Sequence, residues 1–209
     1  MVGTVGLGYG LTTRSEVYVR TSAFWSNTRT ETNNSTSSSS SDGLSDVWIG
    51  TSYHFKNDDD SSPGLVGFSE IALLEKSHSV TSQFKSGMIG LTAYKAIDPV
   101  VFSANTAYRM GATRGQGDSR RRPGSVLLIG GSVAFAANER VSLSSGVQWR
   151  NQQPDEINGQ KKGFRNTRTS LSLGVGYGID ATNIVNVSLR TDISGRDGAD
   201  LNLAWAYTF

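Results

Sequence analysis

A strict alternation of apolar and polar side chains is the dominant pattern along this chain. From Thr169 to Ile179, five of the six odd positions carry large apolar side chains, whereas every even position is Ser or Gly. The segment from Val141 to Arg150 repeats the pattern, with Val, Leu, Val and Trp on four of its five odd positions. A period of two places the two sets on opposite faces of a β-strand. No helical stripe competes with it, so the sequence predicts an all-β protein.

The alternating runs predict eleven strands separated by connections of two kinds. The predicted strands cover residues 2–11, 16–30, 45–56, 65–77, 85–97, 100–114, 126–137, 141–153, 166–180, 184–194 and 199–209. Tight connections at 12–15, 97–99, 137–140 and 180–183 interleave with long polar ones at 31–44, 78–84, 115–125 and 154–165. This rhythm is typical of a transmembrane up-and-down antiparallel β-barrel, whose short turns face the periplasm and whose long loops face outward. We expect the serine-rich run from Asn33 to Ser45 to be a mobile loop.

The odd number of predicted strands needs an explanation, because single-chain bacterial barrels have an even number. With Phe209 at the periplasmic rim, the first predicted strand would descend from the outside. We therefore expect about twelve strands, of which the twelfth would lie upstream of Met1. Residues 1–209 are expected to form a single barrel domain. A barrel of ten strands, without residues 2–11 in the wall, is the alternative. No signal peptide is visible, and we expect it to have been removed.

The last nine residues carry the most specific signal in the chain. Leu201, Leu203, Trp205, Tyr207 and Phe209 alternate with small or polar residues, so one face of this strand is wholly apolar. The segment resembles the closing strand of bacterial outer-membrane β-barrels, which the barrel-assembly machinery recognises. The resemblance implies a location in the bacterial outer membrane, with the assembly machinery as a partner through the strand that ends at Phe209.

Composition removes several classes of function. Lys plus Arg number 20 against 18 Asp plus Glu, and a net charge of +2 does not favour nucleic-acid binding. The absence of cysteine excludes disulfides and thiolate zinc sites. No apolar run reaches the roughly 18 residues of a membrane-spanning helix. We predict no metal site and no cofactor.

Several short motifs resemble one family of outer-membrane proteins. They are Gly8 to Thr12 before Glu16-Val17-Tyr18-Val19, Leu44 to Gly50 running into Tyr53-His54-Phe55, Arg122 to Gly124, Asn138 to Leu143, and the closing strand. They are similar to the transporter-like barrels encoded with meta-pathway phenol degradation, a group that includes the export channel for functional amyloid. The resemblance implies about twelve strands and a transport role. The chain departs from the exporter because it lacks a preceding helical or coiled-coil plug segment.

Charged residues of both signs fall on the polar parity of the predicted strands. On the lipid face each would cost roughly 2–4 kcal/mol at mid-depth, so we expect them to point inward. The predicted pore-lining residues are Glu16, Arg20, Glu70, Arg109, Arg150, Arg168, Arg190 and Asp192. The excess of arginine favours anions in a charged constriction. The alternative is a salt-bridged filling that closes the barrel.

Aromatic residues of the opposite parity are candidates for the belts that mark the two membrane interfaces. The predicted lipid-facing girdle consists of Trp25, Trp149, Tyr177, Trp205, Tyr207 and Phe209.

His54 is the main candidate for acid–base chemistry, since only His54 and His78 are present. A hydrolase would need His54 to meet a nearby serine such as Ser52, with Glu70 on the adjacent strand to orient it. A wetted polar residue in the lumen is the favoured interpretation, and we predict no catalytic residue.

Two charged runs lie in predicted connections. Asp58 to Asp60 lack the spacing of a calcium loop, which favours a solvated turn. Arg120 to Arg122, with Lys161 and Lys162, lie in predicted outer loops, where guanidinium groups suit the phosphates of lipopolysaccharide. A solvated basic loop is the alternative.

The sequence therefore predicts an outer-membrane channel for passive transport of small molecules, hydrophobic or aromatic ones if the family resemblance holds. The alternatives are an export channel for functional-amyloid subunits and an outer-membrane lipid hydrolase that uses His54. The expected partners are outer-membrane lipid, lipopolysaccharide, and a small-molecule solute or an exported polypeptide, with no nucleic acid. A homo-oligomer is compatible with the sequence.

Overall fold

The computed structural model describes residues 2–32, 35–77, 80–82, 85–116, 119–194 and 198–208. These residues form β-strands and the turns between them. The described residues include no helix that is long and apolar enough to cross a membrane.

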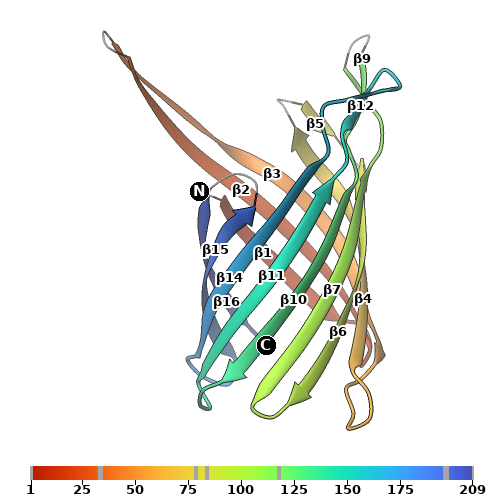
Figure 1. The fold of residues 1–209 in the computed structure, drawn as a ribbon, viewed down its shortest axis with the longest axis vertical. Helices are drawn as coiled ribbons and strands as arrows, with labels where there is room; N and C mark the ends of the chain where they lie inside the picture. The colour runs from red at the N-terminus through yellow and green to blue at the C-terminus, as the bar shows by residue number, and fades with distance from the viewer. Residues whose placement is uncertain are drawn as a thin grey trace.

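One large antiparallel sheet forms the wall of the molecule, and each of its strands pairs with the next in the order of the chain. Figure 1 shows the strands tilted and wrapped into a barrel. The wall strands are β1 (Val2–Gly10), β2 (Ser15–Thr32), β3 (Ser35–Lys56), β4 (Gly64–Ser77), β6 (Ser86–Ile97), β7 (Val100–Gly111), β10 (Val126–Ala136), β11 (Val141–Gln152), β14 (Asn166–Gly178), β15 (Asn183–Ser194) and β16 (Ala199–Tyr207). The prediction of an all-β, up-and-down antiparallel barrel is confirmed.

Three of the predicted long loops contain short paired strands. A second sheet has the order β13 (Gln160–Lys162), β12 (Asp155–Ile157), β9 (Ser119–Arg122) and β8 (Arg114–Gln116), and lies at the upper end of the barrel in Figure 1. The short β5 (Val80–Ser82) pairs with β4 at the same end. The sequence pattern assigned these segments to long loops and did not predict their pairing, because β9 and β12 are distant in sequence.

The connection predicted at residues 31–44 is a continuation of β2 and β3. The two strands stay paired up to Thr32 opposite Ser35, so the expectation of a loop over this serine-rich run was wrong. In an antiparallel ladder the backbone groups of each strand satisfy one another. A polar run can therefore prolong a hairpin without an apolar face. The side chains of residues 24–45 lie outside the described part.

The opposite end of the barrel carries tight turns closed by their own side chains. The Asp180 carboxylate accepts hydrogen bonds from the backbone N–H groups of Thr182 and Asn183, at 2.8 and 2.9 Å. Asn138 Oδ1 closes another turn by accepting from the N–H groups of Arg140 and Val141. Such side-chain acceptors replace backbone partners in turns. Hydrogen bonds from Asn183 and Thr182 lower the pKa of Asp180 to about 2.

The wall sheet has β1 and β16 at its two edges. β1 pairs with β2 from Val2 opposite Phe24 to Gly10 opposite Glu16, so the ten-strand alternative was wrong. No pairing joins β1 to β16 among the described residues. Because β1 and β16 are the first and last of eleven successive antiparallel strands, they run in the same direction. Antiparallel closure would need one more strand between them, and the twelfth strand expected from the sequence stays a prediction.

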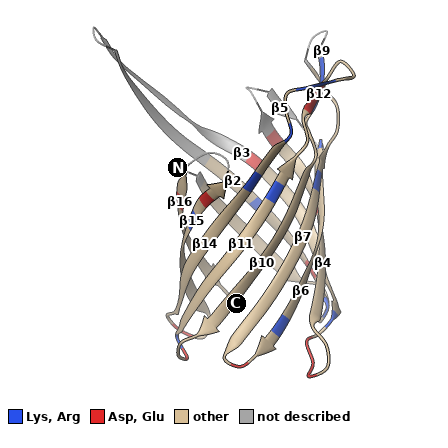
Figure 2. Cartoon of the chain, in the orientation of Figure 1, with Lys and Arg blue, Asp and Glu red and all other residues tan. Residues whose placement is uncertain are grey.

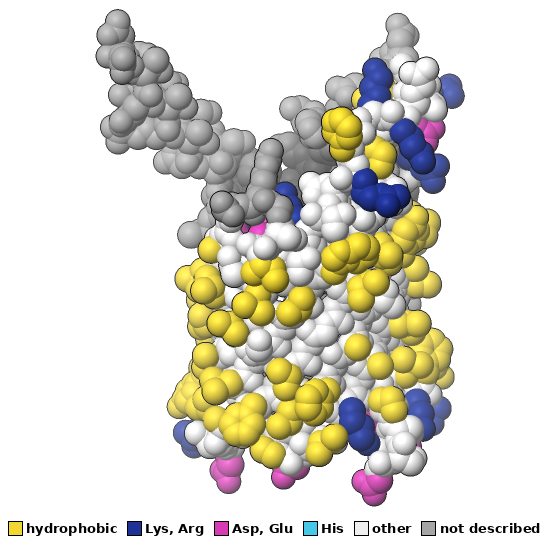
Figure 3. All heavy atoms as spheres, viewed as in Figure 1, with side chains coloured by type: hydrophobic (Ala, Val, Ile, Leu, Met, Phe, Trp, Pro, Cys, Tyr) yellow, Lys and Arg dark blue, Asp and Glu magenta, His cyan; other side chains and the backbone are white. Residues whose placement is uncertain are grey.

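The outward surface of the wall is apolar, whereas the charged residues lie toward its two ends. Figure 3 shows apolar side chains spread over the visible face of the barrel between its two ends. Leu7, Ile89, Leu173 and Leu203 are typical of it, with 53–72% of each residue exposed. Figure 2 shows acidic turns at the lower end and basic residues toward the end that carries the second sheet. The sheet therefore has an apolar belt between two polar rims.

Candidate functional site

The interior face of the wall is identified by contacts between strands that are not neighbours. The guanidinium of Arg109 on β7 lies 5.1 Å from the ring centroid of Trp48 on β3. β4 and β6 separate these strands in the sheet. Since adjacent strands are about 4.8 Å apart, such side chains meet only on the concave face. Trp48 is 2% exposed, so the parity that includes Trp48 and Arg109 points into the barrel.

Glu70 is the acceptor of a buried cluster on this face. Its carboxylate accepts hydrogen bonds from Arg20 Nη2 at 2.6 Å and from Arg20 Nε at 3.2 Å. It also accepts a hydrogen bond from the Tyr18 hydroxyl at 2.9 Å. Glu70 is only 7% exposed, and a buried carboxylate needs such partners to offset its lost hydration. The pair also holds the Arg20 guanidinium 5.1 Å from the Trp48 ring centroid. Arg20 and Arg109 therefore both lie against the Trp48 ring.

Glu75 is a second interior acceptor, which the sequence pattern did not predict. It pairs with Arg109 and with Arg114 Nη2, the latter at 2.5 Å, and it accepts the Ser86 hydroxyl. The pairing register between β3 and β4 shifts at Trp48. At this point the alternation of inward and outward side chains along β4 is reversed. A bulge of this kind reverses the faces of all residues beyond it. Glu75 therefore points inward although its parity assigns it to the lipid face.

The remaining interior cations are only partly neutralised. Arg168 lies 3.4 Å from Asp192, and Arg150 donates to Gln152 Oε1 at 3.1 Å. Neither Arg150 nor Arg190 forms an ion pair within the described part of the chain. Arg150 is directly opposite Arg168 on the neighbouring strand. This side of the interior therefore has an excess of positive charge.

The interior charges continue into a vestibule below the second sheet. This crevice of about 190 Å³ is lined by residues that include Glu75, Arg109, Arg114, Arg121, Arg150 and Asp155. Arg121 of β9 reaches Asp155 of β12 at 2.5 Å. Arg114 of β8 reaches Glu75 of the wall, so ion pairs tie the second sheet to the barrel mouth. Arg121, an outer-loop residue in the sequence prediction, lies beside the interior set.

Aromatic rings line the interior at positions opposite glycine. Tyr18 is directly opposite Gly50, and a Cβ atom at Gly50 would lie 2.6 Å from its ring. Phe68 is likewise directly opposite Gly90 on β6, and Tyr94 is directly opposite Gly64 on β4. In both pairs the ring lies over the glycine. The glycines let each ring lie flat against the wall. These rings were not predicted, although an aromatic residue on the polar parity opposite a glycine is the signal that could have identified them.

The strands β10, β11, β14 and β15 present small polar side chains to the interior. Ser103 and Ser132 are hydrogen-bonded at 2.7 Å across β7 and β10. Ser144 lies opposite Gly174, and Ser142 opposite Gly176. The interior thus has an aromatic side over β2 to β6 and a side of small and cationic residues over β10 to β15. Glu16, the remaining residue of the predicted pore set, lies over Gly8 of β1.

The outward aromatic residues include part of the predicted girdle. Trp205 donates its indole N–H to Asn183 at 3.0 Å, and its ring lies 6.4 Å from that of Tyr207. Tyr177 is 46% exposed, and Trp149 is half-buried on the same outward parity. The side chain of Trp25 and the whole of Phe209 lie outside the described residues.

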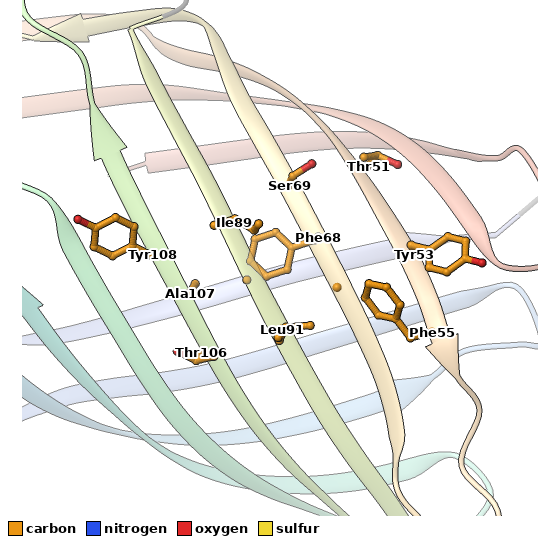
Figure 4. A pocket seen from close by; sticks show the side chains of 12 residues that line it. Thr51, Tyr53, Phe55, Phe68, Ser69, Ile89, Leu91, Thr106, Ala107 and Tyr108 are labelled. Atoms are coloured by element: carbon orange, nitrogen blue, oxygen red, sulfur yellow. The ribbon is translucent and has the colours of Figure 1, made fainter.

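An apolar hollow of about 580 Å³ lies on the outward face of β3, β4, β6 and β7. Figure 4 shows Tyr53 and Phe55 along one side of it, and Ile89, Leu91 and Tyr108 along the other. The rings of Tyr53 and Phe55 meet edge to face at 5.2 Å. The hollow opens toward the surroundings of the barrel and is separate from the interior charges.

The candidate hydrolase residues do not form a triad. His54 is opposite Val66, whereas Glu70 is opposite Gly50, four residues farther along β3. At about 3.3 Å per residue, the two side chains are roughly 13 Å apart along the strand. Glu70 is engaged by Arg20 and Tyr18, so it does not orient His54. His78 lies outside the described residues.

The acidic run after β3 closes a turn. Asp59 accepts hydrogen bonds from Ser61 and Ser62, and these lower its pKa. Asp58 accepts the backbone N–H of Ala96 and lies 3.2 Å from Lys95. The N–H of Ala96, and then Lys95, lower the pKa of Asp58. The Asp59 carboxylate therefore closes the turn, and the Asp58 carboxylate holds the turn against β6.

Comparison with known proteins establishes the fold. No protein-family model matches the sequence, and no curated protein matches it. An outer membrane channel from Pseudomonas putida F1 aligns with a TM-score of 0.69 and 14% identity, over 98% of this chain and 80% of that chain. The NanC porin aligns with a TM-score of 0.58 and 13% identity, over 100% of this chain and 99% of that chain. The chain therefore has the fold of an outer-membrane β-barrel.

Proposed function

We propose that this protein is a bacterial outer-membrane channel for the passive transport of small molecules. The observation that carries the proposal is the opposite chemistry of the two faces of one sheet. Large apolar side chains such as Ile89 and Leu173 are exposed outward, whereas Glu70, Arg150 and Asp192 lie on the interior parity. A transmembrane barrel requires an outward apolar band and tolerates a polar lumen. The two solved structures of this fold are described as an outer membrane channel and a porin, which supports the same function.

The interior suggests how solutes are selected. Arg150 and Arg190 are the interior cations without an ion pair in the described residues, so they supply fixed positive charge that favours anions. Tyr18, Phe68 and Tyr94 supply flat apolar surface on the opposite side. Small aromatic or hydrophobic solutes fit such rings, in agreement with the resemblance to the barrels encoded with phenol degradation. The predicted pore-lining set, extended by Glu75 and these rings, is our proposal for the solute path.

The ion pairs have a supporting role in this mechanism. Glu70 with Arg20, and Glu75 with Arg109 and Arg114, hold long side chains against the wall. Transport then requires no chemical step and no cofactor, because solutes move down their gradient past fixed groups. Trp149, Tyr177, Trp205 and Tyr207 would anchor the barrel at the membrane interfaces, and the C-terminal strand would bind the barrel-assembly machinery.

Solute uptake into liposomes tests the proposal. The refolded chain is incorporated into multilamellar liposomes, and the swelling rate is measured in isotonic sugars, benzoate and phenol. We expect swelling well above that of protein-free liposomes, with benzoate entering faster than a neutral sugar of similar size. Folded protein that leaves the swelling rate at the protein-free level would contradict the proposal.

A further inference from the structure

Two crevices on the outward face meet at the rim that carries the second sheet. Their volumes are about 180 and 370 Å³, and they share Met110, Gly111 and Arg122. Tyr108 lines the first crevice and Ile71 the second. Ile71, Tyr108 and Met110 belong to the apolar outward surface, with 42–52% of each residue exposed. The crevices thus lie where the apolar belt ends.

Three cations surround this apolar floor. Lys85 lines one crevice, Lys161 lines the other, and Arg122 lines both. None of the three forms an ion pair within the described residues. Glu156 is the carboxylate among the described lining residues, so the site keeps a net positive charge. We name the six residues Ile71, Lys85, Tyr108, Met110, Arg122 and Lys161 the outer crevice.

Alternation on β9 separates the outer crevice from the vestibule. Arg121 pairs with Asp155 in the vestibule, whereas the next residue, Arg122, lines the crevices outside the wall. Arg122 Nε donates to the Gly111 carbonyl at 3.3 Å, which fixes the guanidinium at the end of β7. Figure 3 shows basic side chains of this rim directly above the apolar band. The site therefore combines cations facing outward with apolar surface at the adjoining depth.

We propose that the outer crevice binds a phosphorylated glycolipid of the outer leaflet. This rests on the outer-membrane location proposed above. A guanidinium offers a planar pair of donors to a phosphate, and the two ammonium groups add charge on either side. An acyl chain of the same molecule lies along Met110 toward Tyr108 and Ile71. A soluble anion would use only the cations, whereas a membrane lipid uses both halves of the site.

Lipid retention tests the proposal with a matched control. The full chain is refolded into bilayers that contain bis-phosphorylated lipid A, and bound lipid is counted by native mass spectrometry after detergent release. The test variant is Arg122→Gln with Lys161→Gln. The control is Arg14→Gln with Arg140→Gln, which removes the same charge from exposed turns at the opposite rim. Because two surface cations are removed, we expect the test variant to bind lipid A at least about tenfold more weakly than the parent chain. The control should match the parent chain.

Four results would overturn the proposal. Equal retention of lipid A and its dephosphorylated form would show that the cations do not recognise phosphate. Displacement of lipid A by equimolar inorganic phosphate would show a site for the free ion. Equal loss in the test and control variants would show a general charge effect.

Conductance is measured in parallel. A chain that conducts but retains no lipid A refutes this inference alone. A chain that retains lipid A without conducting refutes the channel function alone.

Discussion

Glu70 holds Arg20 in a two-point contact that spans β3, with the Arg20 Nη2 and Nε atoms 2.6 and 3.2 Å from its carboxylate oxygens. On β3, Trp48 is directly opposite Arg20 and Gly50 is directly opposite Glu70, and the Trp48 ring lies against the Arg20 guanidinium. A carboxylate, a cation and an aromatic ring from three successive strands thus form one buried unit. This unit keeps Arg20 against the wall and neutralises it.

Replacing Glu70 by Gln should weaken the barrel and make its interior more positive. The change leaves Arg20 and Tyr18 without a charged acceptor, and hydrogen bonds to charged groups contribute about 1.5–3 kcal/mol each. We expect a loss of about 2 kcal/mol in the free energy of unfolding, measured by urea titration in lipid vesicles. Glu139→Gln, in an exposed turn, is the control and should unfold at the parent midpoint. A Glu70→Gln variant as stable as the parent would show that the unit contributes nothing.

Adjacent serines on β11 test which face borders the solute path. Ser144 lies on the interior parity opposite Gly174, whereas Ser145 points outward opposite Leu173. Ser144→Trp places a ring over a glycine, as Tyr18 does over Gly50, and should roughly halve the single-channel conductance. Ser145→Trp should conduct like the parent chain. Equal conductance in both variants would mean that β11 does not border the path.

A second adjacent pair tests the lipid face. Val147 is in the middle of β11 on the outward parity and is 47% exposed, while Gln148 points inward. Val147→Arg puts a cation at mid-depth in lipid and should cost about 2–4 kcal/mol of folding free energy. Gln148→Arg should cost far less. The measurement is the folded fraction in vesicles as urea is raised, and the reverse order would invert the assignment of faces.

Acid should weaken the turn between β14 and β15. The pKa of Asp180 is lowered from 3.8 to about 2 by hydrogen bonds from Asn183 and Thr182. A lowered folded pKa stabilises the protein above the unfolded value, and that stabilisation is lost as pH falls from about 4 to about 2. Between those values the unfolding midpoint of the parent should fall more steeply than that of Asp180→Asn. Parallel pH profiles would contradict the assignment.

The alternation of apolar and polar residues predicted the wall strands because each strand has a lipid face and an interior face. This contrast is visible in the sequence of each strand by itself. It failed where pairing partners or register decide the outcome. The position of Glu75 in the sequence predicts that it faces the lipid, but the bulge beside Trp48 turns it inward. The pairing of β9 with β12 depends on two loops meeting in space, and neither segment is long enough to show a period.

The aromatic interior was missed for a related reason. Aromatic residues of a membrane barrel are expected at the lipid interfaces, and the outward, exposed Trp205 and Tyr207 were assigned there. Tyr18 and Tyr94 lie on the other parity, and the glycines that accommodate them are on neighbouring strands. Cross-strand register, which no single strand encodes, was needed to match ring with glycine.

The most direct test of the channel is single-channel recording of the refolded chain in a planar bilayer under a salt gradient. We expect discrete conductance steps and a reversal potential that indicates anion preference, because neither Arg150 nor Arg190 forms an ion pair among the described residues. The double variant Arg150→Gln, Arg190→Gln should still conduct, with a reversal potential shifted toward zero. Folded protein that inserts but produces no steps would contradict the account.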